Sequence, residues 1–259
     1  MTEQPPSFHE VSIAGAPRRL AFLKVEGEGP TIVWLGGYRS DMRGTKAERL
    51  SEMARGAGWS FLRLDYSGHG ESDGRFEDGT ITGWTAEARA VIEAQTSGAL
   101  ILVGSSMGAW IALRLARELE AGRVASLLLL APAPDFTSRL VEPSLTGPEC
   151  VALERDGFIA RPSDYGPEPT VYTQGLLDDG CRAAVMDGPI DTGCPVRIIQ
   201  GMADPDVPYD HALELVSHLP GEGVVLTLVA DGDHRLAREE DLARMESAVS
   251  DLVRDARQA

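Results

Sequence analysis

The stretch GSSMG, from Gly104 to Gly108, holds a serine where its hydroxyl could act as a nucleophile. The apolar run from Ala99 to Val103 predicts a buried strand before it, and a helix is expected to start near Met107. Small residues on both sides let a strained strand-to-helix turn pack closely, so its central side chain is held out at the carboxyl edge of the sheet. We therefore predict that Ser106 is a nucleophile and that the neighbouring Ser105 only packs inside.

A serine hydroxyl is a weak nucleophile at neutral pH, so it needs a general base within hydrogen-bond reach and a carboxylate that orients the base. After a serine on such a turn, the acid and then the histidine follow later strands of the sheet. His234 follows a predicted strand at 224–230, and Asp204 follows one at 195–200. We predict His234 as the base and Asp204 as the orienting acid. The alternatives are His69, which breaks this order, for the base, and for the acid Asp206, Asp231 and Asp233.

The oxyanion that forms when a serine attacks a carbonyl carbon needs backbone N–H donors. One is expected from Met107, the residue after the nucleophile. The other is expected from the loop after a predicted strand at 31–35, where Gly36 and Gly37 would let the backbone approach the substrate. We predict the amide of Tyr38 as the second donor and Gly37 as a substrate contact. The alternative is that the two glycines only serve a tight turn.

The rest of the chain must position these residues, and its sequence pattern predicts mostly alternating strands and helices. Two β-rich segments, 8–13 and 19–25, open the chain, and Gly15 to Pro17 predicts a hairpin between them. Further strands are expected at 31–35, 60–65, 99–103, 124–130, 195–200 and 224–230, and helices at 45–57, 82–95, 107–121, 210–219 and 238–253. Such alternation predicts an α/β fold, a mostly parallel twisted sheet flanked by helices.

The alternation breaks between residues 132 and 194, where Pro, Gly and Asp are frequent. Because long irregular insertions in compact domains are usually functional, we predict a core formed by 1–131 and 195–259 and a cap, or lid, formed by 132–194. Apolar side chains of the cap could line a pocket for an acyl group. The side chains predicted to contact substrate are Phe136, Phe158, Tyr172 and, from the core, Trp110. The alternative is a disordered loop.

Composition excludes several classes of partner. The 259 residues carry a net charge of −16 without a basic cluster, so nucleic acid and anionic membrane surfaces are poor partners. Three scattered cysteines form neither a zinc motif nor a disulfide framework, and we expect no metal and no cofactor. We find no signal or transit peptide pattern and no apolar run near the ~20 residues of a membrane span, so we expect a cytoplasmic protein. The oligomeric state is not indicated.

Several stretches together resemble the α/β-hydrolase superfamily, and within it the branch of mitochondrial acyl-protein (palmitoyl-protein) thioesterases. The similar residues are 37–47, 65–68, 101–108 with Trp110, 201–204 and 233–235. The resemblance implies a Ser-His-Asp triad of Ser106, His234 and Asp204 that cleaves carboxylic esters or thioesters through an acyl-enzyme. It also implies a small-molecule ester or thioester, or an acylated protein, as the substrate.

The same residues leave other functions open. C–C bond hydrolases, peptidases and cofactor-free haloperoxidases use the same turn and triad, and this fold also occurs in non-catalytic ligand-binding proteins. A binding protein has little need to keep the serine, the histidine and the acid together, so an ester or thioester hydrolase is the main prediction.

Overall fold

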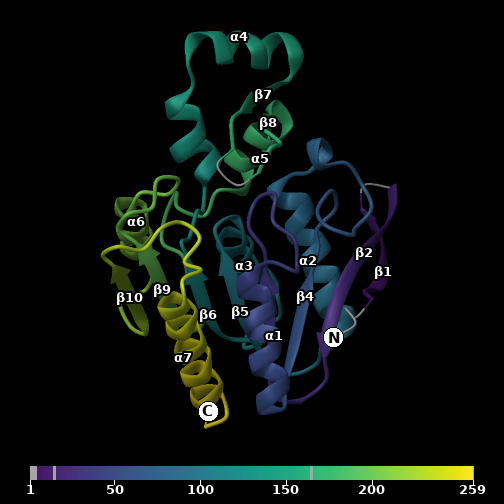
Figure 1. Cartoon of the computed structure of the whole chain (residues 1–259), viewed down its shortest axis with the longest axis vertical. Helices are drawn as coiled ribbons and strands as arrows, with labels where there is room; N and C mark the ends of the chain where they lie inside the picture. The colour runs from purple at the N-terminus through teal and green to yellow at the C-terminus, as the bar shows by residue number, and fades with distance from the viewer. Residues whose placement is uncertain (1–4, 14–15, 164–165, 259) are drawn as a thin grey trace.

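A computed structural model describes residues 5–13, 16–163 and 166–258, and their main feature is an eight-stranded sheet (Figure 1). The strand order is β1-β2-β4-β3-β5-β6-β9-β10, and β2 alone runs in the direction opposite to the other strands. This confirms the mostly parallel α/β sheet predicted from the sequence. The strands are β1 (Ser7–Ile13), β2 (Ala16–Val25), β3 (Glu28–Leu35), β4 (Trp59–Leu64), β5 (Leu100–Ser105), β6 (Val124–Leu130), β9 (Val196–Gly201) and β10 (Val224–Val229).

Helices cover both faces of the sheet and bury its two sets of side chains. On β3, Ile32 and Trp34 belong to one apolar cluster while Val33 and Leu35 belong to another, because successive side chains of a strand point to opposite faces. The first cluster includes side chains of α1 (Thr45–Ala57) and α7 (Glu239–Ala256). The second includes side chains of α2 (Ile81–Gln95), α3 (Met107–Glu118) and α6 (Tyr209–His218).

The chain between β6 and β9 forms a cap above the carboxyl edge of the sheet (Figure 1). It is ordered and built from short elements, so the disordered-loop alternative is wrong for its described residues. After a π-helical turn at Thr137–Val141 come α4 (Gly147–Asp156), the antiparallel pair β7 (Phe158–Arg161) and β8 (Thr170–Thr173), and α5 (Gln174–Ala183).

Two buried carboxylates position the cap: Asp135 joins its two ends to each other, and Asp179 joins it to the core. The Asp135 carboxylate, just after β6, accepts hydrogen bonds from the backbone amides of Val185 and Met186, so it joins the outgoing and returning ends of the cap. Asp179 of α5 accepts from the backbone amide of Thr82 at 2.8 Å, in the first turn of α2. Breaking these bonds would leave the two buried carboxylates without donors, so the bonds hold the cap in one position.

The expected core elements are confirmed, mostly with shifts of one or two residues at their ends; α3 closes at Glu118, earlier than expected, and β3 begins at Glu28 instead of at residue 31. The antiparallel pairing of β1 with β2 agrees with the predicted hairpin, although part of its turn, residues 14 and 15, lies outside the described residues. Within the described ranges, no helix has both the length and the apolar character needed to cross a membrane.

Candidate active site

Ser106 lies at the turn between β5 and α3, where its backbone adopts φ 54° and ψ −118°. A positive φ is unusual for a non-glycine residue and is held here by close packing on both sides. A Cβ atom at Gly104 would lie 2.4 Å from the carbonyl oxygen of Gly108, and one at Gly108 would lie 2.1 Å from that of Leu35. The two glycines are therefore required by space, and the turn holds the serine at the carboxyl edge of the sheet.

Ser106, His234 and Asp204 form one continuous hydrogen-bonded chain. A nucleophile, a base and an orienting acid, the roles predicted for them from the sequence, require this arrangement. His234 Nε2 lies 3.1 Å from Ser106 Oγ, and His234 Nδ1 lies 2.8 Å from Asp204 Oδ2. The histidine comes from the loop after β10 and the aspartate from the loop after β9. Three segments far apart in the sequence thus meet at one edge of the sheet.

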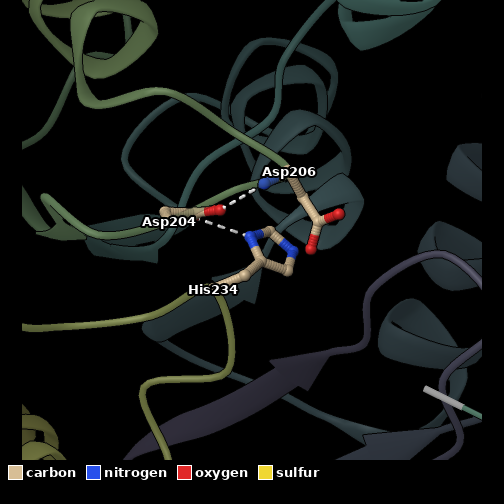
Figure 2. Close-up of side chains that lie close together, drawn as sticks. All are labelled: Asp204, Asp206 and His234. Atoms are coloured by element: carbon tan, nitrogen blue, oxygen red, sulfur yellow. Dashed lines mark hydrogen bonds and ion pairs between the residues drawn. The ribbon is translucent and has the colours of Figure 1, made fainter. Parts of the chain in front are cut away.

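The Asp204 carboxylate is buried and accepts hydrogen bonds from several donors, of which Figure 2 shows the Asp206 amide and His234. Its Oδ1 accepts from the backbone amides of Asp206 and Val207 at 2.9 and 2.8 Å, and its Oδ2 accepts from Gln200 Nε2 at 3.2 Å as well as from His234. Burial alone would raise the pKa of Asp204, but the hydrogen bonds and the histidine outweigh it and hold the pKa below its usual value. An ionised carboxylate can only accept, so His234 Nδ1 carries the hydrogen and Nε2 is left to accept from Ser106.

The three other acids and the other histidine considered from the sequence have different surroundings. The exposed carboxylate of Asp206 lies beside the imidazole, while its backbone amide serves Asp204 (Figure 2). Asp231 pairs with Arg238, and Asp233 accepts from the amide of Leu236. His69 is buried elsewhere, and both of its nitrogens are engaged by backbone groups.

Two backbone amides are available where an oxyanion would form. Among the described residues, neither the Tyr38 amide nor the Met107 amide donates to another protein group. Met107 opens helix α3, whose first N–H groups have no intrahelical acceptor and carry the positive end of the helix dipole. The Tyr38 loop is close to the serine, because a Cβ at Gly37 would lie 3.3 Å from Ser106 Cβ. The role of these two amides as oxyanion donors stays a prediction.

The ring of Tyr38 contacts the cap. It stacks on Tyr172 of β8 with centroids 5.6 Å apart and planes 2° apart, and it packs at 5.6 Å against Phe136. The Tyr38 hydroxyl donates to the carbonyl oxygen of Val171. Burial raises the pKa of Tyr38 well above its ordinary value, so the phenol stays protonated and keeps this bond. Of the predicted substrate contacts, Phe136 and Tyr172 therefore lie against the loop at 36–40, called the oxyanion loop below because it carries the predicted Tyr38 donor.

The other two predicted substrate contacts are placed differently. Trp110 is 0% exposed, donates from Nε1 to the Ala183 carbonyl at 3.1 Å and packs at 5.7 Å against Phe136, so it supports Phe136 from beneath. Phe158 is 47% exposed on β7, opposite Thr173. Trp110 can act on a bound group only through its neighbours, while Phe158 stays a prediction.

Sequence reasoning missed two residues that support the site. Gln200, the residue before the last of β9, bonds through Nε2 to Asp204, to its own neighbour Gly201 and to the Val207 carbonyl. Lys46 of α1 donates from Nζ to the carbonyl oxygen of Arg235, next to His234, and burial lowers the pKa of Lys46 to about 8. The position of Gln200 near the end of a strand could have indicated that it lies close to Asp204. Lys46 and Arg235 are too far apart in the sequence for spacing to predict their contact.

Three side chains of the site could in principle hold a metal ion. They are Asp204, Asp206 and His234, whose possible metal-ligand atoms all lie within 4.8 Å of one another. The 2.8 Å between His234 Nδ1 and Asp204 Oδ2 is a hydrogen-bond distance. Two ligands of one tetrahedral zinc ion lie about 3.3 Å apart, since each bond is about 2.0 to 2.1 Å long. The distance between His234 and Asp204 is therefore that of a hydrogen bond and not that of two zinc ligands. We interpret the cluster as part of the hydrogen-bonded chain that ends at Ser106.

Comparison with known proteins agrees with the geometry. The model of the alpha/beta hydrolase family matches residues 32–256. The chain belongs to the alpha/beta hydrolase family. It is an enzyme of the hydrolase class, in agreement with the sequence prediction.

The relatives of this α/β hydrolase include thioesterases. Bovine (Bos taurus) mitochondrial palmitoyl-protein thioesterase ABHD10 is 30% identical over 97% of this chain and 85% of its own length. The structure of mouse ABHD10 has a TM-score of 0.85 at 28% identity, covering 96% of this chain and 99% of that one. A crystal structure of a protein from Agrobacterium vitis S4 is more similar, with a TM-score of 0.92 and 50% identity over 96% of this chain and 100% of that one. The names of the ABHD10 proteins place them in mitochondria; the location of this chain stays a prediction.

Proposed function

We propose that this α/β hydrolase cleaves carboxylic thioesters, and oxygen esters of similar shape, through an acyl-enzyme on Ser106. The observation that carries the proposal is the unbroken hydrogen-bonded chain from Ser106 Oγ through His234 to the ionised Asp204. Hydrogen bonds of this kind are what a serine needs to lose its proton as it attacks.

The first half of the reaction forms the acyl-enzyme. The Ser106 hydroxyl passes its proton to His234 Nε2 while Oγ attacks the carbonyl carbon of the substrate. The carbonyl oxygen becomes an oxyanion, which the amides of Tyr38 and Met107 stabilise by donating to it. The tetrahedral intermediate then expels the thiol or alcohol, which takes the proton from His234.

The second half regenerates the serine. A water molecule gives a proton to His234 Nε2 and attacks the acyl carbon, the same two amides hold the second oxyanion, and Ser106 leaves with the proton from His234. Asp204 remains ionised throughout and keeps the imidazole in the required tautomer. No step needs a group other than side chains, backbone amides and water.

The substrate class rests on the cap and on the relatives. The aromatic side chains of Tyr38, Phe136 and Tyr172 meet beside the oxyanion loop and offer apolar surface for an acyl group. The relatives that are about 30% identical over most of the chain are thioesterases by name. The names of these relatives therefore favour a thioester over an amide as the substrate.

The test compares Ser106→Ala with Ser105→Ala, a matched change at the neighbouring buried serine. A fluorophosphonate should label the wild type and Ser105→Ala but not Ser106→Ala, and Ser106→Ala should lower kcat for an acyl N-acetylcysteamine thioester by roughly 10⁴-fold or more. Labelling of Ser106→Ala at the wild-type rate would overturn the assignment.

The same enzyme samples should be tested with acyl thioesters of increasing chain length and with a matched ester and amide. We expect kcat/KM to rise with chain length, by at most about 0.8 kcal/mol of transition-state stabilisation per buried CH₂ group, until the pocket is full. Activity confined to amides, to C–C bonds or to halide oxidation would favour one of the other reactions that this fold supports, and no turnover of any substrate would favour a ligand-binding protein.

A further inference from the structure

His69 lies in the loop after β4 and is 3% exposed. Its ring is surrounded by the aromatic rings of Tyr66, Phe76 and Trp84, with centroids 5.5, 5.1 and 5.1 Å away. A titratable ring in such an apolar place needs a reason to be there, because a phenylalanine or leucine would fill the space without polar atoms to satisfy.

Both nitrogens of His69 are bonded to backbone groups. Nδ1 lies 3.2 Å from the carbonyl oxygen of Ser67, which can only accept, so Nδ1 carries the hydrogen. Nε2 is then the acceptor for the backbone amide of Arg39 at 3.3 Å. Burial lowers the pKa of His69 to about 4, so the ring is neutral at neutral pH and Nε2 remains able to accept.

The amide that His69 holds belongs to a strained residue. Arg39 has φ 59°, a left-handed backbone conformation that is common for glycine but that few other residues adopt. Such a conformation persists only where its surroundings stabilise it. The bond to His69 and the packing of the Arg39 guanidinium over Phe76, 5.2 Å from the ring centroid, are two such contacts.

Arg39 directly follows Tyr38, whose amide is the proposed oxyanion donor. The loop is thus fixed at both ends: Gly37 lies against the Ser106 turn, and the Arg39 amide is bonded to His69. With the Arg39 amide engaged in this way, the neighbouring Tyr38 amide has no protein acceptor among the described residues. A change at His69 would release the Tyr38–Arg39 peptide plane. The shift of the loop that follows would displace the Tyr38 amide, which belongs to the preceding Gly37–Tyr38 plane.

We propose that His69 is a positioning residue for the oxyanion hole: its Nε2 holds the Arg39 amide so that the Tyr38 amide stays directed at the oxyanion. The inference rests on the proposed function, since it needs an oxyanion formed at Ser106. It also explains why the loop carries a histidine that is neither the base nor a partner of Ser106.

The test uses two variants of opposite chemistry. In His69→Gln the side-chain oxygen reaches about the place of Nε2 and can still accept from Arg39, whereas His69→Leu keeps an apolar packing and has no acceptor. The two readouts are kcat and KM for a short acyl thioester, and the affinity of a trifluoromethyl ketone, which adds to a serine and forms an oxyanion.

We expect His69→Leu to lower kcat by about 10- to 100-fold, less than the 10²- to 10³-fold typical of a deleted oxyanion donor, with KM within about twofold. The affinity of the ketone should fall by the same factor as kcat, and His69→Gln should recover most of both. If His69→Leu does not fold, His69→Asn replaces it, because the shorter amide can serve Ser67 but cannot reach Arg39.

Three results would overturn the proposal. They are an unchanged kcat in the folded variant that lacks the acceptor, a loss of kcat with no loss of ketone affinity, and a folded His69→Gln as impaired as His69→Leu. The control is Ser106→Ala: if it retains turnover, the proposed function itself fails, whereas an inactive Ser106→Ala with fully active His69 variants contradicts only the role of His69.

Discussion

Asp204 and Asp206 are two residues apart, yet their carboxylates have different surroundings. Asp204 is buried and bonded to His234, Gln200 and two amides, while the Asp206 side chain is exposed. Asp204→Asn places an amide where the ionised acceptor was and favours the wrong tautomer of His234, so kcat should fall by about 10⁴-fold. Asp206→Asn keeps the backbone amide that serves Asp204 and should change kcat by less than about tenfold. Steady-state kinetics on one thioester measure both, and the opposite ranking would move the orienting role to Asp206.

The lowered pKa of His69 gives a pH dependence of stability. The folded pKa is about 4, against about 6.5 for an unfolded chain, so between these values the unfolded state binds more protons. The free energy of unfolding should therefore decrease as the pH falls from 6.5 to 4, by up to about 3 kcal/mol from this residue. The charges that act on the ring, Arg39 and Asp41, have opposite signs and oppose each other.

Denaturant unfolding at several pH values, with His69→Gln as the reference, isolates this contribution. The difference in unfolding free energy between wild type and variant should become smaller or reverse as the pH is lowered, because the variant has no group to protonate at this position. A difference that is constant from pH 6.5 to 4 would show that His69 is solvated enough to keep an ordinary affinity for protons.

At the scale of the elements, one residue joins the oxyanion loop to the cap. Tyr38→Phe removes the hydrogen bond to the Val171 carbonyl but keeps the backbone amide and the stack on Tyr172. We expect it to reduce the free energy of unfolding by about 1 kcal/mol and to leave most of kcat for an acetyl thioester. Tyr38→Ala also removes the stack and should reduce stability further. Thermal unfolding and kinetics test both, and a loss as large as that of Ser106→Ala in Tyr38→Phe would mean that the phenol itself takes part in the chemistry.

The elements that the sequence predicts well are those whose pattern is set by burial and local capping. Strand β6 is almost wholly apolar because helices cover both faces of the sheet, and α1 ends as expected because Gly58 adopts the left-handed conformation at φ 68°. The positions of Ser106, His234 and Asp204 followed from the same strand ends.

The cap was harder to predict because its elements are short and held by contacts far apart in the sequence. Strands β7 and β8 have four residues each, and most of these residues are half-buried or exposed. Since neither strand has one regularly buried face, their sequences show no alternation of apolar and polar residues. One signal was present: Thr146 and Glu149 form a reciprocal capping box that starts α4. The contacts of Lys46 with Arg235 and of His69 with Arg39 arise only when the loops of the carboxyl edge meet, so no local pattern shows them.

For the whole molecule, the dominant property is its net charge of −16, from 40 acidic and 24 basic residues. A charge of this size produces a negative potential that repels anions approaching the surface and slows their association. Salt screens this repulsion, because the Debye length falls from about 30 Å at 0.01 M to about 8 Å at 0.15 M. Substrates that share one acyl group but differ in charge should therefore respond differently to ionic strength.

We expect kcat/KM for an acyl-CoA, whose phosphates are anionic, to rise severalfold as NaCl is increased from about 10 to 150 mM. The matched N-acetylcysteamine thioester is neutral, so its kcat/KM should change by less than about twofold, and a thioester on a lysine-rich peptide should lose activity over the same range. The three measurements use one acyl chain and one enzyme preparation, so the leaving group is the variable. If kcat/KM for the acyl-CoA fell as salt was added, a local cluster of cations would be attracting its phosphates more strongly than the net charge repels them. A CoA thioester would then become the better substrate class. The expected ordering instead favours neutral or basic acyl carriers, such as an acylated protein.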